Sequence, residues 1–232
     1  MTAKAHLSAV PDADALIADM GARARVAAKR LAVVPTADKA AGLRAAAAQL
    51  RLRADAILDA NRRDMAAGKS AGLSAAMLDR LRLDDARLGG IADAVEAVAA
   101  LPDPVGMEID RAVRPNGMEL SRVRVPLGVV GIIYESRPNV TADAAALGLM
   151  SGNAVILRGG SEAVQSNRAI HAALAAGLAS VGLPADAVQL VPTQDRAAVG
   201  ALLRAQGLVD IIIPRGGKSL VARVQDLSLI HI

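Results

Sequence analysis

The sequence predicts an α/β protein with a Rossmann-type parallel sheet, preceded by a helical region and a β-hairpin arm. From Pro126 onward, short apolar runs alternate with helical patterns, and strands that alternate with helices form parallel sheets through right-handed crossovers. Hydrophobic residues make up 53% of the 232 residues, yet the chain has one Tyr and neither Phe nor Trp. A core of Leu, Ile, Val and Met suits helices packed on a parallel sheet better than an aromatic-rich sandwich.

Residues 1–107 are expected to form an N-terminal helical region that packs on the sheet. Apolar residues at helical spacing predict a first helix, after which Pro35-Thr36 offers a break followed by an N-cap. The run 37–65 is dense in strong helix formers and predicts one long helix. A short helix near Ser74–Leu81 and another over Asp85–Ala100 complete the region. The spaced residues of the first helix are Leu16, Met20, Ala24, Ala27 and Leu31.

Residues 108–125 are expected to form a β-hairpin arm. Two extended runs, Glu108–Arg114 and Met118–Val125, flank Pro115-Asn116-Gly117, and Asn-Gly is a strong hairpin signal. The second run alternates imperfectly between apolar and polar residues. Such a hairpin is a candidate for a free-standing arm.

Residues 126–227 are expected to form a nucleotide-binding α/β region. The predicted strands are Val129–Tyr134, Val155–Leu157, Val188–Val191 and Val209–Ile213. The predicted helices are Val140–Met150, Glu162–Ala179, Asp195–Ala205 and one that begins over Lys218–Val224.

Three of these strands end in polar or glycine-rich turns that open onto helices, namely Glu135–Asn139, Arg158–Ser161 and Pro214–Lys218. Because the carboxyl ends of parallel strands lie at one edge of a sheet, the three turns are expected to form a single nucleotide site. The third turn ends like a Walker A loop, but the first Gly of that motif would fall at Ile212. Its glycines are therefore expected to let the backbone approach a cofactor in front of a helix N-terminus.

Spacing alone leaves two interpretations of Asn139 and of Arg158. The Asn139 amide is able to donate to a carbonyl oxygen that gains negative charge, a contribution of about 3–4 kcal/mol. It is equally able to cap the helix that begins near Val140, and spacing favours the cap. Arg158 is either a cofactor-binding residue or a solvent-facing Arg at a strand end.

The composition excludes several other functions. Lys and Arg number 27 against 23 Asp and Glu, a net charge of +4, with the two signs interleaved. Without an aromatic platform for bases, nucleic-acid binding is not expected, whereas an anionic small molecule suits this balance. The absence of Cys excludes disulfides and thiolate metal sites, and no spacing of His, Asp and Glu suggests a metal. No signal peptide and no apolar run of roughly 18 residues is present, so a cytoplasmic protein without a membrane segment is expected.

The run Arg122–Thr141, RVRVPLGVVGIIYESRPNVT, resembles the γ-glutamyl phosphate reductase family (glutamate-5-semialdehyde dehydrogenases) of the aldehyde dehydrogenase superfamily. The segments Gly152–Arg158 and Ile213–Gly217 resemble it too, and the resemblance extends to about Leu227. It implies NADPH-dependent reduction of L-glutamyl 5-phosphate to L-glutamate 5-semialdehyde, with release of phosphate, in L-proline biosynthesis. In such enzymes a Cys thiolate attacks the acyl carbon and the resulting thioester accepts hydride.

The resemblance also implies a role for the first turn. Pro138-Asn139 matches the segment in which the family keeps its oxyanion-stabilising Asn. Other aldehyde dehydrogenases usually carry an aromatic residue just before the Asn, whereas Arg137-Pro138 precedes it in this chain. Ser136 and Arg137 are therefore expected to bind the substrate, with Arg137 taking its phosphoryl group bidentately. The alternative for Arg137 is a surface ion pair with Glu135.

The resemblance also implies that the second and third turns bind NADP(H). Arg158 occupies the position of a basic residue beside the adenosine ribose, and Ser161 falls where relatives that prefer NAD often carry Glu. An Arg without that carboxylate favours a ribose 2′-phosphate. The expected cofactor-binding residues are Arg158, Gly159, Gly160, Ser161, Thr193, Pro214, Gly216 and Gly217.

The nucleophile of the resembled family is absent, because the chain has no Cys. The resemblance assigns that Cys to a C-terminal catalytic domain, expected to be missing here, and residues 228–232 are expected to be a truncation tail. The chain alone is therefore expected to be inactive. The resemblance further implies that the full-length form is a homo-oligomer to whose assembly the arm contributes, and that it is coupled to the glutamate kinase that makes the acyl phosphate. The alternatives are another aldehyde dehydrogenase superfamily member and a non-catalytic nucleotide-binding or oligomerisation module.

Overall fold

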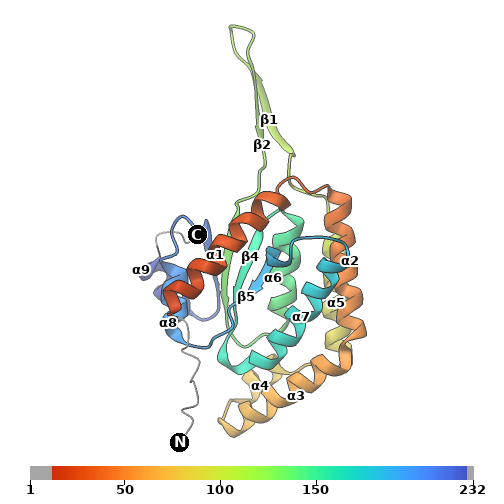
Figure 1. Cartoon of the computed structure of the whole chain (residues 1–232), viewed down its shortest axis with the longest axis vertical. Coiled ribbons are helices and arrows are strands. Elements are labelled where there is room, and N and C mark those ends of the chain that lie inside the picture. The colour runs from red at the N-terminus through yellow and green to blue at the C-terminus, as the bar shows by residue number, and fades with distance from the viewer. Residues whose placement is uncertain (1–11, 229–232) are drawn as a thin grey trace, which may run out of the picture.

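The computed structural model describes residues 12–228, which form a four-stranded parallel sheet between layers of helices and a two-stranded arm (Figure 1). Apart from Ser228, the expected tail 228–232 lies outside the described residues. The helices are α1 Ala13–Leu31, α2 Thr36–Leu52, α3 Ala54–Ser70, α4 Ala75–Leu81, α5 Asp85–Ala99, α6 Asn139–Met150, α7 Val164–Ser180, α8 Arg196–Leu203 and α9 Lys218–Leu227. Two short 3-10 turns are η1 Ser161–Ala163 and η2 Ala185–Ala187. The strands are β1 Glu108–Val113, β2 Glu119–Val123, β3 Val129–Tyr134, β4 Ala154–Arg158, β5 Val188–Leu190 and β6 Ile211–Arg215.

The sheet has the strand order β5-β4-β3-β6, and all of its pairings are parallel. Strand β3 is buried along its whole length and pairs with β4 on one side and β6 on the other. The chain moves outward from β3 through β4 to β5 and then returns to the far side of β3. This order confirms the predicted Rossmann-type sheet and puts its topological switch point between the carboxyl ends of β3 and β6.

Helices cover both faces of the sheet. The crossovers through α6 and α7 run in one direction and the crossover through α8 runs back, so α8 lies with α1 on the opposite face (Figure 1). Helices α2 and α5 pack outside α6 and α7 (Figure 1). A Cβ added to Gly177 of α7 would lie 2.4 Å from the Cα of Ala46 in α2, so these two helices touch almost at backbone distance. No helix among residues 12–228 has the length and apolar character needed to cross a membrane.

The single helix predicted over 37–65 is wrong, because the chain turns at Arg53 (φ −101°, ψ 20°) between α2 and α3. The turn lets Asp64 of α3 reach the start of α7, where its carboxylate accepts from the backbone N–H groups of Gln165 (3.1 Å) and Ser166 (2.7 Å). Helix α7 accordingly begins at Val164 rather than at Glu162. Tertiary contacts override the uniformly strong helix propensity of this run.

Thr36 is not the N-cap that the sequence predicted. Pro35 holds the N-cap position, and the Thr36 hydroxyl instead donates to the Asp103 carboxylate (2.8 Å). The ammonium group of Lys39, which is only 1% exposed, forms an ion pair with the same carboxylate. Asp103 also accepts from the Val105 N–H (2.9 Å), so these contacts fasten the segment that leads into the arm to α2.

Strand β6 begins later than predicted and extends through Pro214 to Arg215. The Val209 N–H still bonds to Ala205 at the end of α8 (2.9 Å), which delays the start of the strand. Pro214 lies opposite Ile133 in the ladder and belongs to the strand rather than to the turn, as is tolerated at a sheet edge. The turn before α9 therefore consists of the two glycines, Gly216 and Gly217.

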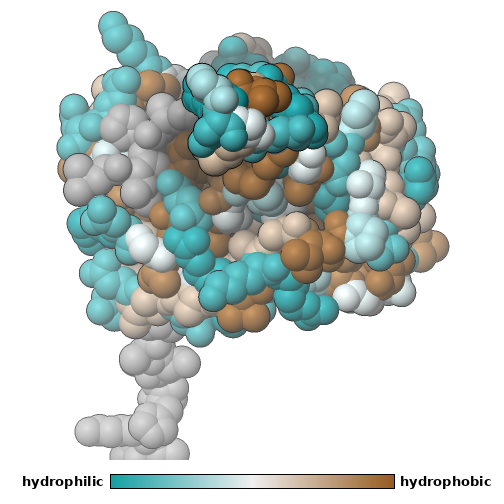
Figure 2. Space-filling model, turned by 90° about the horizontal axis from the view of Figure 1, so that it is seen from above, coloured by the Kyte–Doolittle hydropathy of each residue, from teal (hydrophilic) through white to brown (hydrophobic). Residues whose placement is uncertain are grey.

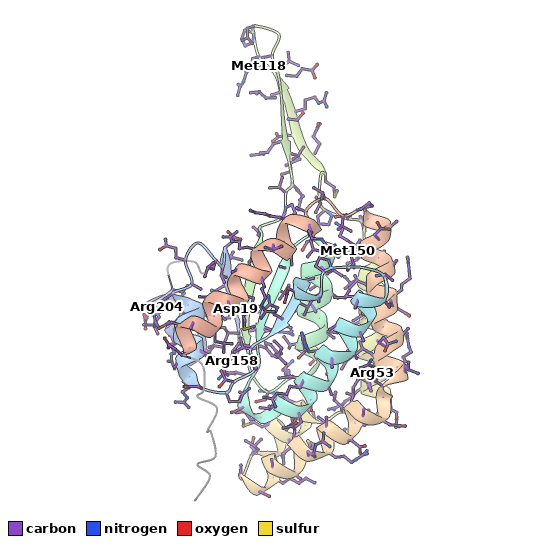
Figure 3. The ribbon with its side chains drawn as sticks, in the orientation of Figure 1. Asp19, Arg53, Met118, Met150, Arg158 and Arg204 are labelled. Atoms are coloured by element: carbon purple, nitrogen blue, oxygen red, sulfur yellow. The ribbon has the colours of Figure 1, made fainter. Side chains whose placement is uncertain are left out.

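The predicted hairpin is confirmed. Strands β1 and β2 pair antiparallel, and the Arg114 N–H donates to the Met118 carbonyl (2.9 Å) across a turn in which Gly117 has φ +80°. Every residue of both strands is exposed. Met118 lies at the far tip of the arm (Figure 3). Seen from the side of the arm, the surface mixes hydrophobic and hydrophilic residues (Figure 2).

Candidate functional site

The three turns meet at the carboxyl edge of the sheet, at the end away from the arm, where Arg158 lies (Figure 3). The Glu135 carboxylate accepts from the Gly217 N–H (3.0 Å) and so joins the first turn to the third. A Cβ added to Gly160 would lie 3.3 Å from the backbone N of Ser136, so the second turn touches the first. The Ser136 hydroxyl also donates to Glu162 (3.2 Å). The three turns thus form one continuous surface, as their sequence positions predicted.

One cleft, which we call cleft A, lies between the second turn, α8 and α9 and has a volume of about 380 Å³. Burial lowers the pKa of Arg158, and the charges of Arg196 and Arg223 lower it further, while Glu162 raises it. Cleft A therefore holds a group of guanidinium charges that the carboxylates of Glu135 and Glu162 offset in part. Its lining residues are Ile133, Tyr134, Glu135, Arg158, Gly160, Ser161, Glu162, Gln194, Arg196, Val199, Ser219, Leu220 and Arg223.

Cleft A offers unpaired polar groups to a ligand. Within residues 12–228, two buried polar atoms of its lining, Arg158 Nε and Gln194 Oε1, have no hydrogen-bond partner. The other Arg158 nitrogens donate to the carbonyls of Gly159 (3.0 Å) and Gln194 (3.1 Å), which holds the side chain along the cleft. A Cβ on Gly160 would lie 2.5 Å from Glu162 Oε2 and 3.3 Å from the Ser136 N, so a side chain here would crowd the first turn and displace the Glu162 carboxylate. A bound polar molecule would satisfy both unpaired atoms.

The other expected cofactor residues lie around cleft A in different ways. Gly159 lies behind the cleft, since its Cβ would fall 2.2 Å from Asn167 Nδ2. Thr193 does not line the cleft, and its hydroxyl accepts from the Asp195 N–H (3.1 Å) ahead of α8. Pro214 lies within β6. Gly216 and Gly217 line a neighbouring cleft rather than cleft A.

Asn139 does not cap α6, so the interpretation that spacing favoured is wrong. Pro138 holds the N-cap position, and the Asn139 amide donates to the Asp143 carboxylate (2.9 Å) one helical turn later. Burial raises the pKa of Asp143, while this hydrogen bond and the Arg215 charge oppose the rise. The sequence analysis missed Asp143, although an Asn and an Asp four residues apart in a helix are a recognisable pair.

Two further clefts flank the first turn. Cleft B has a volume of about 560 Å³ and cleft C about 540 Å³. Arg80 and Arg137 line both, and Asn139 and Asp143 line cleft C. Cleft B is lined by Met77, Arg80, Glu135, Ser136, Arg137, Val140, Arg215, Gly216 and Gly217. Cleft C is lined by Asp79, Arg80, Arg82, Leu83, Arg87, Gly90, Ile91, Ala94, Arg137, Pro138, Asn139 and Asp143.

The fold defines an α/β protein with a Rossmann-type parallel sheet. A family model described as the aldehyde dehydrogenase family matches residues 2–228. A curated protein named gamma-glutamyl phosphate reductase from Sphingopyxis alaskensis is 80% identical over 93% of this chain and 50% of its own length. A protein of the same name from Rhizorhabdus wittichii is 72% identical over 94% of this chain and 51% of its own length.

A solved structure gives the same relationship. The crystal structure of gamma-glutamyl phosphate reductase from Thermotoga maritima superposes with a TM-score of 0.90 at 38% identity, covering 93% of this chain and 52% of that one. The chain belongs to the aldehyde dehydrogenase family, which implies a nicotinamide cofactor. It spans about half the length of the curated relatives it matches.

Proposed function

We propose that this chain takes part in the NADPH-dependent reduction of L-glutamyl 5-phosphate to L-glutamate 5-semialdehyde, with release of phosphate, in L-proline biosynthesis in the cytoplasm. The observation that carries the proposal is the 80% identity to a relative named gamma-glutamyl phosphate reductase. The chain contributes the cofactor cleft and an oxyanion-stabilising amide. A thiolate nucleophile has to come from outside these 232 residues, because the chain has no Cys.

Asn139 is proposed to stabilise the acyl oxygen as it gains negative charge. One N–H of its amide is directed to Asp143, which fixes the rotamer and leaves the second N–H free to donate. A bound nicotinamide cofactor supplies the hydride that reduces the acyl group.

The cofactor is proposed to be NADP(H), bound in cleft A. Arg158, Arg196 and Arg223 supply guanidinium charge suited to a ribose 2′-phosphate. Ser161 keeps the cleft wall uncharged at its own position, but Glu162 puts a carboxylate one residue further on. That carboxylate accepts from the hydroxyls of Ser136 and Ser161. With three cations against Glu162 and Glu135 in the lining, the balance favours a phosphate over a bare ribose.

A second candidate function is a non-catalytic nucleotide-binding or oligomerisation module. The absence of Cys favours it for the chain by itself. Both candidates share cleft A and differ in whether the Asn139 amide has an acyl group to act on.

The cofactor part of the proposal is tested by titrating the purified chain with NADPH and with NADH, followed by cofactor fluorescence. NADPH is expected to bind more tightly, and Arg158→Ala is expected to weaken NADPH binding about tenfold while changing NADH binding far less. Since Arg158 also holds the carbonyls of Gly159 and Gln194, Arg196→Ala serves as a second variant that leaves those bonds in place.

Arg63→Ala is the matched control, because Arg63 is exposed on α3 and lines none of the three clefts. Equal affinity for the two cofactors, or a loss with Arg63→Ala as large as with Arg158→Ala, would refute NADPH selection by cleft A.

A further inference from the structure

Two arginines beside Asn139 have no partner among the described residues. Neither the guanidinium of Arg80, on α4, nor that of Arg137, in the first turn, makes an ion pair or a hydrogen bond within residues 12–228. Neighbouring arginines of cleft C are held in place, since Arg87 pairs with Asp79 (2.8 Å) and Arg82 lies between Asp79 and Asp84. An unpaired cation in a cleft favours an anionic ligand.

The carboxylates of clefts B and C are already engaged by other groups. Asp79 is paired with Arg87, and Asp143 accepts from Asn139. Glu135 accepts from the Gly217 N–H. Within residues 12–228, no carboxylate of either cleft is paired with Arg80 or Arg137, and both side chains line the two clefts.

Arg80 and Arg137 approach this volume from different elements. Arg80 comes from a short helix of the N-terminal region, and Arg137 from the end of β3, yet both line clefts B and C. Cleft C also contains Asn139. A group bound between the two arginines is therefore adjacent to the amide that is proposed to hold the acyl oxygen.

We propose that Arg80 acts with Arg137 as a clamp for the phosphoryl group of the acyl phosphate substrate. This inference rests on the proposed function. In an acyl phosphate the phosphoryl oxygen is bonded to the acyl carbon itself, so a carbonyl oxygen at Asn139 brings the phosphoryl group within reach of both arginines. Guanidinium groups bind phosphate oxygens bidentately and with directional hydrogen bonds.

The clamp also has a role in the chemical step. When the thiolate forms its C–S bond to the acyl carbon, the bond from that carbon to the phosphoryl oxygen breaks, and the electron pair leaves with phosphate. The leaving group gains negative charge at the position that the two guanidinium groups occupy. Charge placed there beforehand stabilises the departing phosphate without reorganisation. Arg80 is thus a specificity-determining residue contributed by the helical region rather than by the sheet.

The test is a titration of the purified chain with inorganic phosphate, followed by broadening of the phosphate ³¹P signal. Arg80→Gln and Arg137→Gln are each expected to weaken phosphate binding about tenfold, the factor typical of a hydrogen bond between charged groups. Arg63→Gln, an equal charge change on exposed α3, is expected to stay within about twofold of the unsubstituted chain. L-Glutamate at the same concentration is expected not to displace phosphate.

Several outcomes would overturn the clamp. One is phosphate binding that is lost with Arg158→Ala and unchanged with Arg80→Gln, which would assign the anion to cleft A. Others are displacement by L-glutamate, equal losses in all variants, or no phosphate binding by the unsubstituted chain. NADPH affinity measured on the same samples separates the two proposals. If NADPH binds normally and phosphate binding does not depend on Arg80, the clamp is refuted and the cofactor assignment stands.

Discussion

Tyr134, the single aromatic residue of the chain, ends β3 in a buried network. Its hydroxyl lies 2.8 Å from the Thr141 hydroxyl, which donates in turn to Asn167 Oδ1 (3.0 Å). Burial raises the pKa of Tyr134 to about 12, so the phenol stays protonated and donates to Thr141. The network ties β3 to α6 and α7 directly beneath the first and second turns. A satisfied buried network of this kind makes the carboxyl end of β3 rigid.

His171, in α7, gives a prediction about the pH dependence of stability. Burial lowers its pKa below the ordinary value of 6.5, although its hydrogen bond to the Val188 carbonyl (2.9 Å) opposes the shift. Below pH 6.5 the unfolded chain therefore takes up a proton that the folded chain resists. Stability should fall as the pH drops through this window, and the loss should stop once the folded-state pKa is passed. His171→Gln is expected to flatten this part of the profile.

The measurement is urea unfolding of both chains at several values between about pH 7.5 and pH 5. Only the difference between the two chains counts, since the carboxylates titrate in both. If the difference in unfolding free energy stays constant across the range, the buried-histidine explanation is wrong.

At the scale of single residues, the sequence predicts the site residues within the three turns better than the site residues that other helices contribute. Arg137, Asn139 and Arg158 lie at strand ends and are visible in a βαβ pattern. Arg80 was not predicted, because its place beside Asn139 depends on how α4 packs against the first turn. Glu162 was not predicted either, because its contact with Ser136 joins two turns that are far apart in the sequence.

The elements of the sheet were predictable because buried parallel strands are continuous apolar runs. Val129–Tyr134 was predicted with the bounds that the structure has. The break at Arg53 was not predictable in the same way, since both α2 and α3 are built from strong helix formers. Only the position of Asp64 at the start of α7 explains why the chain turns there.

The arm is the element whose stability calls for a partner. A two-stranded hairpin alone is marginally stable in water, and its edges leave backbone groups unpaired. Apolar side chains along it are exposed as well, at 50% for Ile109 and 66% for Val113. We therefore propose that the chain self-associates through the arm.

Excision of the arm tests whether the chain self-associates through it. Met107 and Arg124 pair at its base, where the Arg124 N–H donates to the Met107 carbonyl (2.9 Å), so an Asn-Gly turn is able to join them. The shortened chain is expected to unfold at nearly the same temperature, because no residue of either strand is buried. The shortened chain is expected to sediment as a monomer, and the intact chain is expected to self-associate. Leu52→Ser, at an exposed apolar residue of α2, is the control and should leave association unchanged. Unaltered association after excision would contradict the role of the arm.

At the scale of the whole molecule, an apolar groove lies open beside α6, next to the site around Asn139. The groove lies between α6, β3 and β6 and has a volume of about 290 Å³. Leu147 on its rim is 54% exposed. Its apolar lining residues are Leu127, Val130, Ile132, Val140, Ala144, Leu147 and Ile213. An exposed apolar hollow of this size next to Asn139 is suited to packing against another part of a longer protein.

The relatives suggest what that part is, because this chain spans about half of their length. We expect that joining the chain to the half of the Sphingopyxis alaskensis relative that it does not match yields a protein that forms NADPH from glutamate 5-semialdehyde, NADP⁺ and phosphate. The chain alone should form none, since it has no thiol. In the joined protein, Asn139→Ala should lower kcat by about 10²–10³, the usual loss for one oxyanion-stabilising donor.

The intact relative, assayed alongside, fixes the turnover that the joined protein should approach. Turnover by the chain alone would mean that the thiolate mechanism is wrong for this protein. A folded joined protein without turnover, beside an active relative, would instead point to the non-catalytic module. If turnover appears and Asn139→Ala removes it, the 232 residues already contain the cofactor cleft and the oxyanion donor in working geometry, and the nucleophile is the component that the second half supplies.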